Sequence, residues 1–460
     1  MSRSFLSTIV CFSGLFGLFL FPVAAGASEH QRPVLFENVR VFDGTQERLS
    51  EVTAVLVVDG KIAAIGEIDD VAELNPVRIH GAGHTLMPGM IDVHTHLAIT
   101  TAPSAVNGMI SAEENAIRSA VIARDFLMDG FTAVRDLGGN TFGLKRSIDS
   151  GLVPGPRIYP SGAFVSQTSG HGDFRLPEEP HPHTGHVNGS ERLGLAVVAD
   201  GVDEVYRAVR ENLRRGATQI KIMGSGGAGS DFDPIDSLQY QPEEQRAAVA
   251  AAADWDTYIT AHLHTDPAID RALDSGIRCV DHGFMIAEPT MQKLVEKNVF
   301  LASNLNAMSP RLMDMPGLKQ VNLDKIAWAQ AQMENLLPLV RKYQPKMPFA
   351  VDALGPPPDQ IRQRRFELFY GAELFGAART LVRATSVAAE LLARSGRRNP
   401  YGRLGVIEVG AVADILLIAG NPLEDITLVG GDSAWWDADT GPIATMPVVM
   451  KGGAVVRNEL

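Results

Sequence analysis

The chain has 460 residues, 45% of them hydrophobic and 21% charged, which is ordinary for a globular protein with a full core. Its formal net charge of −13 argues against nucleic acid or an anionic membrane surface as the binding partner. The length allows two to three domains, although a single α/β barrel can take roughly 250 residues or more.

The first 27 residues have the pattern of a secretory signal peptide. Arg3 precedes a largely apolar run over 5–23, and Ala25-Gly26-Ala27 forms a small-X-small cleavage site. The run reaches the length of a membrane span, but serine, glycine and proline residues interrupt it, so cleavage is favoured over anchoring. We therefore expect an exported, periplasmic or secreted chain without a stable membrane anchor after cleavage. Cys279 would then be its only thiol, which excludes an internal disulfide.

Both ends of the remaining chain have the pattern of β structure. Apolar stretches at 34–36, 53–58 and 62–65 predict strands, and Asp59-Gly60 predicts a two-residue hairpin turn between the last two. Similar stretches follow at 413–418 and 448–456. These patterns predict one small β-sandwich domain that is assembled from residues 28–86 and 403–460.

The middle of the chain, residues 87–402, alternates strand-like and helical patterns. Strands are expected at 132–136, 157–162, 219–223, 258–262, 279–282 and 349–352, with helices such as 201–215 and 242–253 between them. Roughly eight such units favour a (β/α)8 TIM barrel, whose active site forms at the carboxyl ends of the strands. Long loops are expected at 164–200, 224–240 and 302–325. The first contains His181, His183 and His186, which we interpret as loop histidines near solvent in preference to metal ligands.

Two histidines, His94 and His96, end the strand-like segment that begins at Met90. Residues i and i+2 of a strand point to the same side, so the two imidazoles project together. Such a pair can hold one divalent metal, and neutral nitrogen ligands suit zinc. A chance polar strand end is the alternative for this pair taken alone.

Lys221 lies within a strand of apolar residues. A buried ammonium group is costly unless it is paired or chemically changed. One interpretation is a salt bridge to a carboxylate of the barrel. The other is that carbon dioxide carboxylates the side chain, which gives a carbamate that bridges two metals. The residues His262, His282 and Asp352 end other expected strands.

The order His-X-His, lysine, histidine, histidine, aspartate resembles the amidohydrolase superfamily in its binuclear-zinc, carboxylated-lysine form. Segments 87–96, 219–222, 261–262, 281–283 and 410–414 carry the resemblance, which covers nearly all of the mature chain. Segments 161–163 and 168–173 are similar to the branch with imidazolonepropionase-like sequence that includes Xaa-Pro and other C-terminal dipeptidases and ochratoxin-cleaving amidohydrolases. Residues 349–353 depart from the pattern, because they lack the Gly-Thr that often precedes the aspartate.

The resemblance implies two zinc ions per subunit. The more buried ion would be bound by His94, His96 and Asp352, the second by His262 and His282, and N6-carboxylated Lys221 would bridge them. Asp352 would take the proton of a bridging hydroxide and pass it to the leaving amine. His171 would be a catalytic and substrate-binding helper at the carbonyl oxygen.

Two further residues are candidates for the substrate pocket. His264 competes with His262 for the ligand position, since both lie on one face, and the Ala-His context favours His262 as the ligand and His264 as pocket lining. Tyr240 resembles a tyrosine that contacts the substrate carboxylate in the dipeptidase branch. Its alternative role is to cap the helix that begins at Pro242.

The favoured function is metal-dependent hydrolysis of C-terminal peptide or N-acyl amino-acid bonds, ochratoxin included. The alternative is a cyclic-amide hydrolase of imidazolonepropionase type, against which the export signal and Lys221 count. A third possibility is a barrel that binds without hydrolysis, which the filled ligand positions disfavour. The methionines of 308–316 suggest an apolar, adaptable pocket wall. The resemblance also suggests a homo-oligomer.

Overall fold

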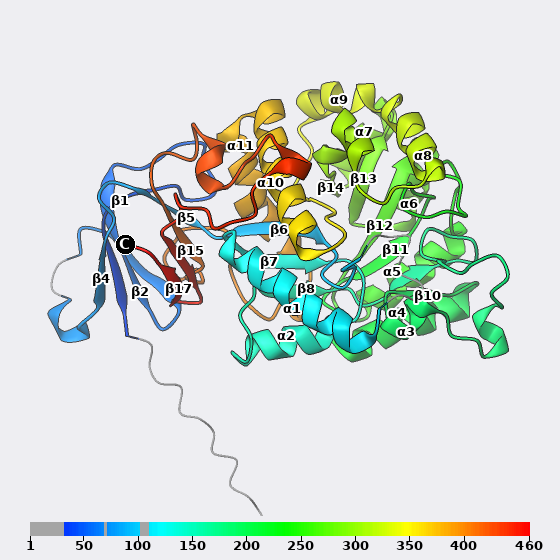
Figure 1. The fold of residues 1–460 in the computed structure, drawn as a ribbon, viewed down its shortest axis with the longest axis horizontal. Helices are drawn as coiled ribbons and strands as arrows, with labels where there is room; N and C mark the ends of the chain where they lie inside the picture. Colours follow the sequence, from blue (N-terminus) through cyan, green and yellow to red (C-terminus); the bar gives the residue numbers. More distant parts are fainter. Residues whose placement is uncertain (1–31, 69–70, 102–109) are drawn as a thin grey trace, which may run out of the picture.

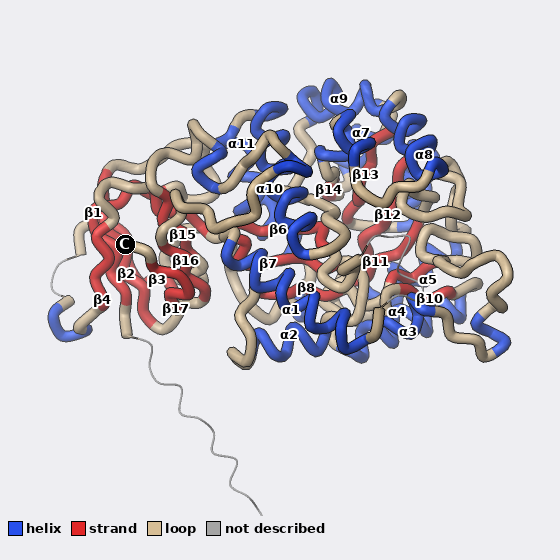
Figure 2. The backbone as a smooth tube through the Cα atoms, viewed as in Figure 1, coloured by secondary structure: helices blue, strands red, loops and turns tan. Residues whose placement is uncertain are grey.

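The computed structural model describes residues 32–68, 71–101 and 110–460, and the expected signal peptide lies outside them. No helix in these ranges is long and apolar enough to cross a membrane. A small β-rich part, which contains both ends of the described chain, lies beside a larger part built of strands and helices (Figure 1). Figure 2 shows the strands of both parts in red and the helices that cover the larger part in blue.

The small part is one sheet of eight strands from both ends of the chain. Its strands are β1 (Val34–Val41), β2 (Val52–Val58), β3 (Lys61–Gly66), β4 (Val77–His80), β5 (Thr85–Pro88), β15 (Ile415–Ile418), β16 (Val448–Lys451) and β17 (Ala454–Asn458). The order is β17-β16-β15-β5-β1-β2-β3, and β4 also pairs with β1. Strands from both ends of the chain thus belong to one sheet. Its division into two layers stays a prediction, because hydrogen bonds connect all eight strands.

The hairpin between β2 and β3 forms at the predicted turn. Asp59 and Gly60 have φ angles of 48° and 73°, and positive φ at both central residues is the geometry that an Asp-Gly turn favours. Val58 pairs with Lys61 directly beyond the turn. The turn thereby sets the register of the two strands.

The larger part contains two parallel sheets. One holds β6 (Met90–Thr95), β7 (Phe131–Asp136) and β8 (Arg157–Pro160). The other has the order β10 (Ala196–Val198), β9 (Phe164–Ser166), β11 (Ile220–Met223), β12 (Ile259–Thr265), β13 (Cys279–Met285) and β14 (Phe300–Ala302). The α/β class is confirmed. The expected loop 164–200 is more ordered than predicted, because it includes β9 and β10.

Helices follow or flank most of these strands. They are α1 (Ala112–Met128), α2 (Phe142–Asp149), α3 (Gly189–Leu193), α4 (Val202–Arg215), α5 (Pro242–Ala253), α6 (Asp266–Ser275), α7 (Glu288–Glu296), α8 (Gln320–Gln330), α9 (Leu336–Tyr343), α10 (Pro357–Phe375), α11 (Ala377–Val382) and α12 (Ala388–Ala393). Helix α5 has the predicted bounds. Helix α4 buries Val205, Val209 and Leu213 at helical spacing, so one face joins the core and the other stays polar.

The described strands do not close into a barrel. The predicted strand at 349–352 is wrong: the segment belongs to no strand ladder, and Asp352 at its end has a φ of 60°, outside the extended region. The segment still bonds to β6, since Val93 N–H donates to Phe349 (3.0 Å) and Asp352 N–H donates to His94 (2.8 Å). No ladder joins β8 to β9 either, so the two sheets remain separate. A closed (β/α)8 barrel is therefore not confirmed.

A buried ion pair connects the two parts. Arg157 at the start of β8 donates to both carboxylate oxygens of Asp414, at 2.8 and 3.1 Å, and Gly452 N–H donates to the same carboxylate at 2.7 Å. Only 14% of the Arg157 side chain and 3% of the Asp414 side chain are exposed. The pair therefore holds β8 of the larger part against the β16–β17 hairpin.

Replacing Asp414 with alanine should destabilise the protein by about 3 kcal/mol, because it leaves the Arg157 charge buried without a partner. Urea unfolding followed by circular dichroism measures this loss. The matched control is Arg207→Met, since that arginine side chain is 73% exposed and meets its carboxylate only at 4.0 Å. The control should cost less than about 0.5 kcal/mol, and equal losses in the two variants would contradict the prediction.

Candidate metal centre

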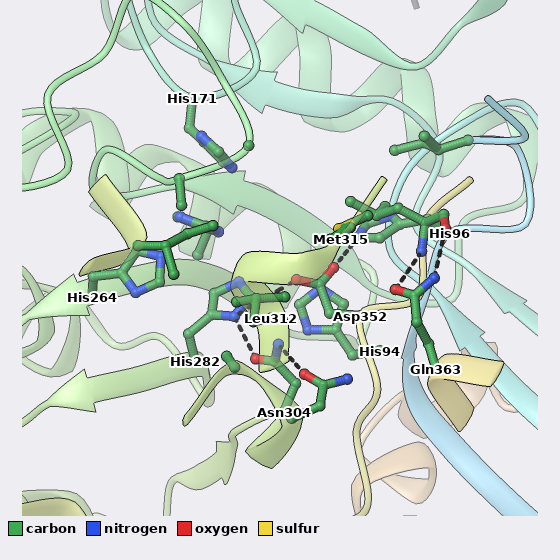
Figure 3. Close-up of a pocket in the computed structure, with 18 of the residues that line it drawn as sticks. His94, His96, His171, His264, His282, Asn304, Leu312, Met315, Asp352 and Gln363 are labelled. Atoms are coloured by element: carbon green, nitrogen blue, oxygen red, sulfur yellow. Dashed lines mark hydrogen bonds and ion pairs between the residues drawn. The ribbon is translucent and has the colours of Figure 1, made fainter. Parts of the chain in front are cut away.

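A cavity opens among the strand ends of the larger part and encloses about 1140 Å³, its open mouth included. It gathers side chains that the sequence places far apart (Figure 3). The predicted site residues in its wall are His94, His96, His171, Lys221, His262, His264, His282 and Asp352. The structure thus brings together every predicted metal ligand.

Asp352 is the side chain on which three histidines converge. Its Oδ1 lies 3.0 Å from His96 Nε2 and 3.4 Å from His94 Nε2, and its Oδ2 lies 4.0 Å from His282 Nδ1. His94, His282 and Asp352 offer ligand atoms that all lie within 4.8 Å of one another. This is the spacing that one metal ion requires of its ligands.

The backbone is strained at two of these positions. His282 and Asp352 have φ angles of 70° and 60°, in a region where residues with a Cβ cost about 1–3 kcal/mol. His282 lies within β13 and Asp352 ends the 349–352 segment, and both side chains line the cavity. Asn304 accepts a hydrogen bond from His282 Nδ1 at 2.9 Å, which leaves Nε2 of that ring available to a ligand. Sequence reasoning did not identify Asn304.

Four histidines of the cavity favour the uncharged form that binds metals. Burial lowers the pKa of His94, His262 and His264 well below the usual range, and burial lowers the pKa of His282 to about 4. The Nδ1 atoms of His94, His96 and His264 are buried without a hydrogen-bond partner in the described chain. Imidazoles with unpartnered ring nitrogens beside one carboxylate fit a divalent metal such as zinc.

Lys221 is paired with a carboxylate. Its Nζ lies 2.6 Å from Asp281 Oδ2, while Asp281 Oδ1 accepts from Arg135 at 2.8 Å, and all three side chains are almost fully buried. The ion-pair interpretation is therefore realised in the structure. Burial also lowers the pKa of Lys221, which favours the neutral amine that reacts with carbon dioxide. A carbamate nitrogen keeps one N–H, so this hydrogen bond is compatible with carboxylation, which stays a prediction.

Both histidines of β12 line the cavity. The His262 ring lies 4.3 Å from the His282 ring, stacks on His171 at 4.0 Å and places Nε2 3.3 Å from the Gly226 carbonyl. The His264 ring stacks on His282 at 5.0 Å. Either residue can reach a metal at His282, so the preference for His262 stays a prediction.

Tyr240 is not brought to the cavity. Its side chain is 2% exposed, and its hydroxyl donates to the carbonyl of Ala199 at 2.9 Å. It does not cap α5 either, because the capping residue is Gln241, whose N–H donates to Glu244 at 2.7 Å. Neither role considered for this tyrosine matches its position.

The three loop histidines also lie outside the cavity wall, and each faces an acid. His181 lies 3.6 Å from Asp200, His183 lies 2.6 Å from Glu204, and His186 lies 3.7 Å from Glu179. Their side chains are 27–58% exposed. These positions agree with the interpretation as loop residues near solvent.

Apolar side chains make up most of the remaining wall. They are Ile99, Phe164, Phe174, Met223, Phe284, Leu312, Met315, Leu318, Ile326, Leu354 and Trp435. Leu312 and Met315 come from the expected methionine-rich wall. Trp435 comes from the C-terminal segment and stacks on Phe366 at 3.9 Å. No local pattern marks Trp435, since its place depends on how the end of the chain crosses α10.

The fold and the site define an α/β protein with a buried histidine-rich cluster that can hold a metal. The model of the Amidohydrolase family matches residues 85–443, and the chain belongs to this family. It is an enzyme of the class that hydrolyses amide bonds in small molecules. The superfamily and the branch predicted from the sequence are confirmed.

Three relatives illustrate the branch. The chain is 31% identical to the ochratoxinase of Aspergillus niger over 425 residues. The aligned region covers 88% of this chain and 84% of that protein. A prolidase solved with N-methylphosphonate-L-proline has 36% identity and a TM-score of 0.82, over 93% of this chain and 100% of the other. A Xaa-Pro dipeptidase with methionine in its active site has 25% identity and a TM-score of 0.77 over the same shares.

Proposed function

We propose that this amidohydrolase is a zinc enzyme that cleaves C-terminal peptide bonds or N-acyl amino-acid bonds. The observation that carries the proposal is the convergence of His94, His96 and His282 on Asp352 inside a largely apolar cavity. The relatives also support this proposal, because their names describe an ochratoxinase, a prolidase and a Xaa-Pro dipeptidase.

The proposed ligands of two zinc ions are His94, His96, Lys221 in its carboxylated form, His262, His282 and Asp352. When bound, the ions would polarise the amide carbonyl and lower the pKa of water, so that a nucleophile is present at neutral pH. The hydrogen bond from Lys221 Nζ to Asp281, which a carbamate N–H can keep, holds the lysine nitrogen in the cavity wall.

Asp352 is suited to carry a proton between the attacking water and the leaving amine. Burial would raise its pKa, but the hydrogen bond with His96 and the nearby His282 lower the pKa below its ordinary value. The carboxylate is therefore ionised at neutral pH and can accept a proton. Its side chain is 23% exposed, so it faces the space that a substrate enters.

The cavity wall favours an apolar or aromatic substrate group. Among the described residues of this wall, Lys221 is the only lysine or arginine. Binding of the substrate must therefore depend on its apolar parts and on the metal cluster. This supports N-acylated or C-terminal aromatic and aliphatic amino acids as substrates.

Three further proposals follow from the sequence and from the family resemblance. The parallel strands, with segment 349–352 in place of a strand beside β6, correspond to an open form of the (β/α)8 barrel typical of the superfamily, and the terminal strands to a β-sandwich. The mature chain is exported, and it assembles as a homo-oligomer.

A substrate panel tests the function. With zinc supplied, the purified protein should hydrolyse N-acyl-phenylalanine, Xaa-Pro or Xaa-Phe dipeptides or ochratoxin A at least about 100-fold more efficiently than cyclic amides. Amine release measured with a fluorogenic reagent gives kcat/KM for the linear substrates. Faster hydrolysis of imidazolone-type rings would instead establish the cyclic-amide alternative.

A further inference from the structure

His171 is held in the cavity wall by a second group of residues outside the metal cluster. Its Nδ1 lies 2.7 Å from Ser230 Oγ and 3.1 Å from Asp233 Oδ2. Its backbone N–H donates to the side chain of Gln239 at 2.9 Å. A Cβ on Gly227 would lie 2.2 Å from the ring, so the imidazole packs directly on the backbone of the 226–234 turn. The ring therefore has little freedom to rotate.

Asp233 is built into this turn as an acceptor. Only 1% of its side chain is exposed, and it also accepts from Gly227 N–H at 2.8 Å and from the Ser230 hydroxyl. Burial would raise the pKa of Asp233, but His171, these hydrogen bonds and Lys325 lower it below the ordinary value. An ionised carboxylate can only accept, so His171 Nδ1 must carry the hydrogen. In the described chain, Nε2 has no protein partner.

Helix α8 fixes the turn through a lysine. Lys325 Nζ donates to the carbonyls of Gly227 (3.0 Å), Ser230 (2.8 Å) and Asp233 (2.5 Å), and it lies 3.6 Å from Asp233 Oδ1. Only 12% of the Lys325 side chain is exposed. The next residue, Ile326, lines the substrate cavity. One turn of α8 thus lines the cavity and also holds the 226–234 turn that contacts His171.

We propose that Asp233 is a positioning residue: it accepts the His171 Nδ1–H and so fixes the ring with Nε2 facing the reacting amide group in the cavity. Lys325 holds the turn that carries Asp233. This inference rests on the proposed amide hydrolysis and extends it to residues outside the metal cluster. No pattern in the sequence pairs His171 with Asp233, which lies 62 residues later. Carboxylate support of a catalytic imidazole is a general device, because it fixes both the tautomer and the orientation.

A double-mutant cycle tests the proposal in the zinc-loaded enzyme. Asp233→Asn should lower kcat about 30-fold and His171→Ala about 100-fold, with KM changed less than threefold, because a side chain that acts on the reacting amide contributes mainly in the transition state. In the His171→Ala background, Asp233→Asn should lower kcat less than twofold. The matched control is Asp231→Asn, which removes an ion pair of the same turn with Lys319 and should leave kcat unchanged.

Two measurements separate positioning from a structural effect. Zinc content and thermal unfolding should be the same in Asp233→Asn and in the unmodified enzyme. Affinity for the N-methylphosphonate derivative of the best substrate's amino acid should fall in parallel with kcat/KM, since this tetrahedral group resembles the transition state. Additive losses in the double variant, or loss of zinc in Asp233→Asn, would overturn the proposal. An unmodified enzyme that hydrolyses no linear amide would overturn the proposed function as well.

Discussion

Replacing Lys221 with alanine is expected to remove bound metal and hydrolytic activity together. In the proposed centre, the two metal positions would lose the carbamate of Lys221 as a shared anionic ligand. We expect kcat/KM to fall on the order of 10³-fold and bound zinc to fall from two ions per chain to one or none. Mass-spectrometric metal analysis of the dialysed protein measures the second effect.

Lys221→Arg distinguishes the carbamate from the ion pair with Asp281. Arginine keeps a positive charge beside that carboxylate, but a guanidinium does not form the bridging carbamate. The variant should fold and still lack activity. If Lys221→Arg kept full activity, Lys221 would serve only as an ion-pair partner. Lys293→Ala is the control, since this lysine pairs with Asp270 and Asp274 at the surface and should keep two zinc ions.

Asp352→Asn should produce the second large loss. The amide has nearly the same shape but cannot accept a proton, so kcat should fall about 10³-fold while KM changes only a few-fold. Zinc at saturating concentration must be present in the assay, because the substitution also removes an anionic ligand. Stopped-flow measurement of amine release gives both constants.

The control for this variant is Asp324→Asn on the outer side of α8. That carboxylate accepts a hydrogen bond from Gln320 at 2.8 Å and lies in an exposed setting. Its replacement should leave kcat unchanged. Wild-type kcat in Asp352→Asn would show that another group moves the proton.

The elements that could be predicted are those with a strong local signal. The β2–β3 hairpin follows from Asp59-Gly60, and α5 follows from Pro242 at its start and a run of strong helix formers. The strand predicted at 349–352 did not form, although the composition of the segment favours a strand, and Asp352 adopts a positive φ. That conformation depends on contacts with β6, which are distant in sequence.

In the site, too, local sequence patterns could be predicted and contacts between distant residues could not. Residue types and their order along the chain placed the histidines, Lys221 and Asp352 in one cavity. They did not reveal that Asp281 pairs with Lys221, or that Asp233 supports His171, because each partner comes from another element 60 or more residues away. The roles predicted for Tyr240 also did not match its position. Its hydroxyl donates to the carbonyl of Ala199, a contact between residues distant in sequence.

The central place of β5 in the terminal sheet sets the order in which the chain can fold. Thr85 donates to the carbonyl of Gly420, 335 residues later, and β5 pairs with β15 along its whole length. Contacts this distant form slowly, because the intervening chain must be ordered first. Until residues 415–418 have been synthesised, one edge of β5 has unpaired hydrogen-bonding groups that can recruit a second chain. Aggregation of unfinished chains should therefore begin at this sheet.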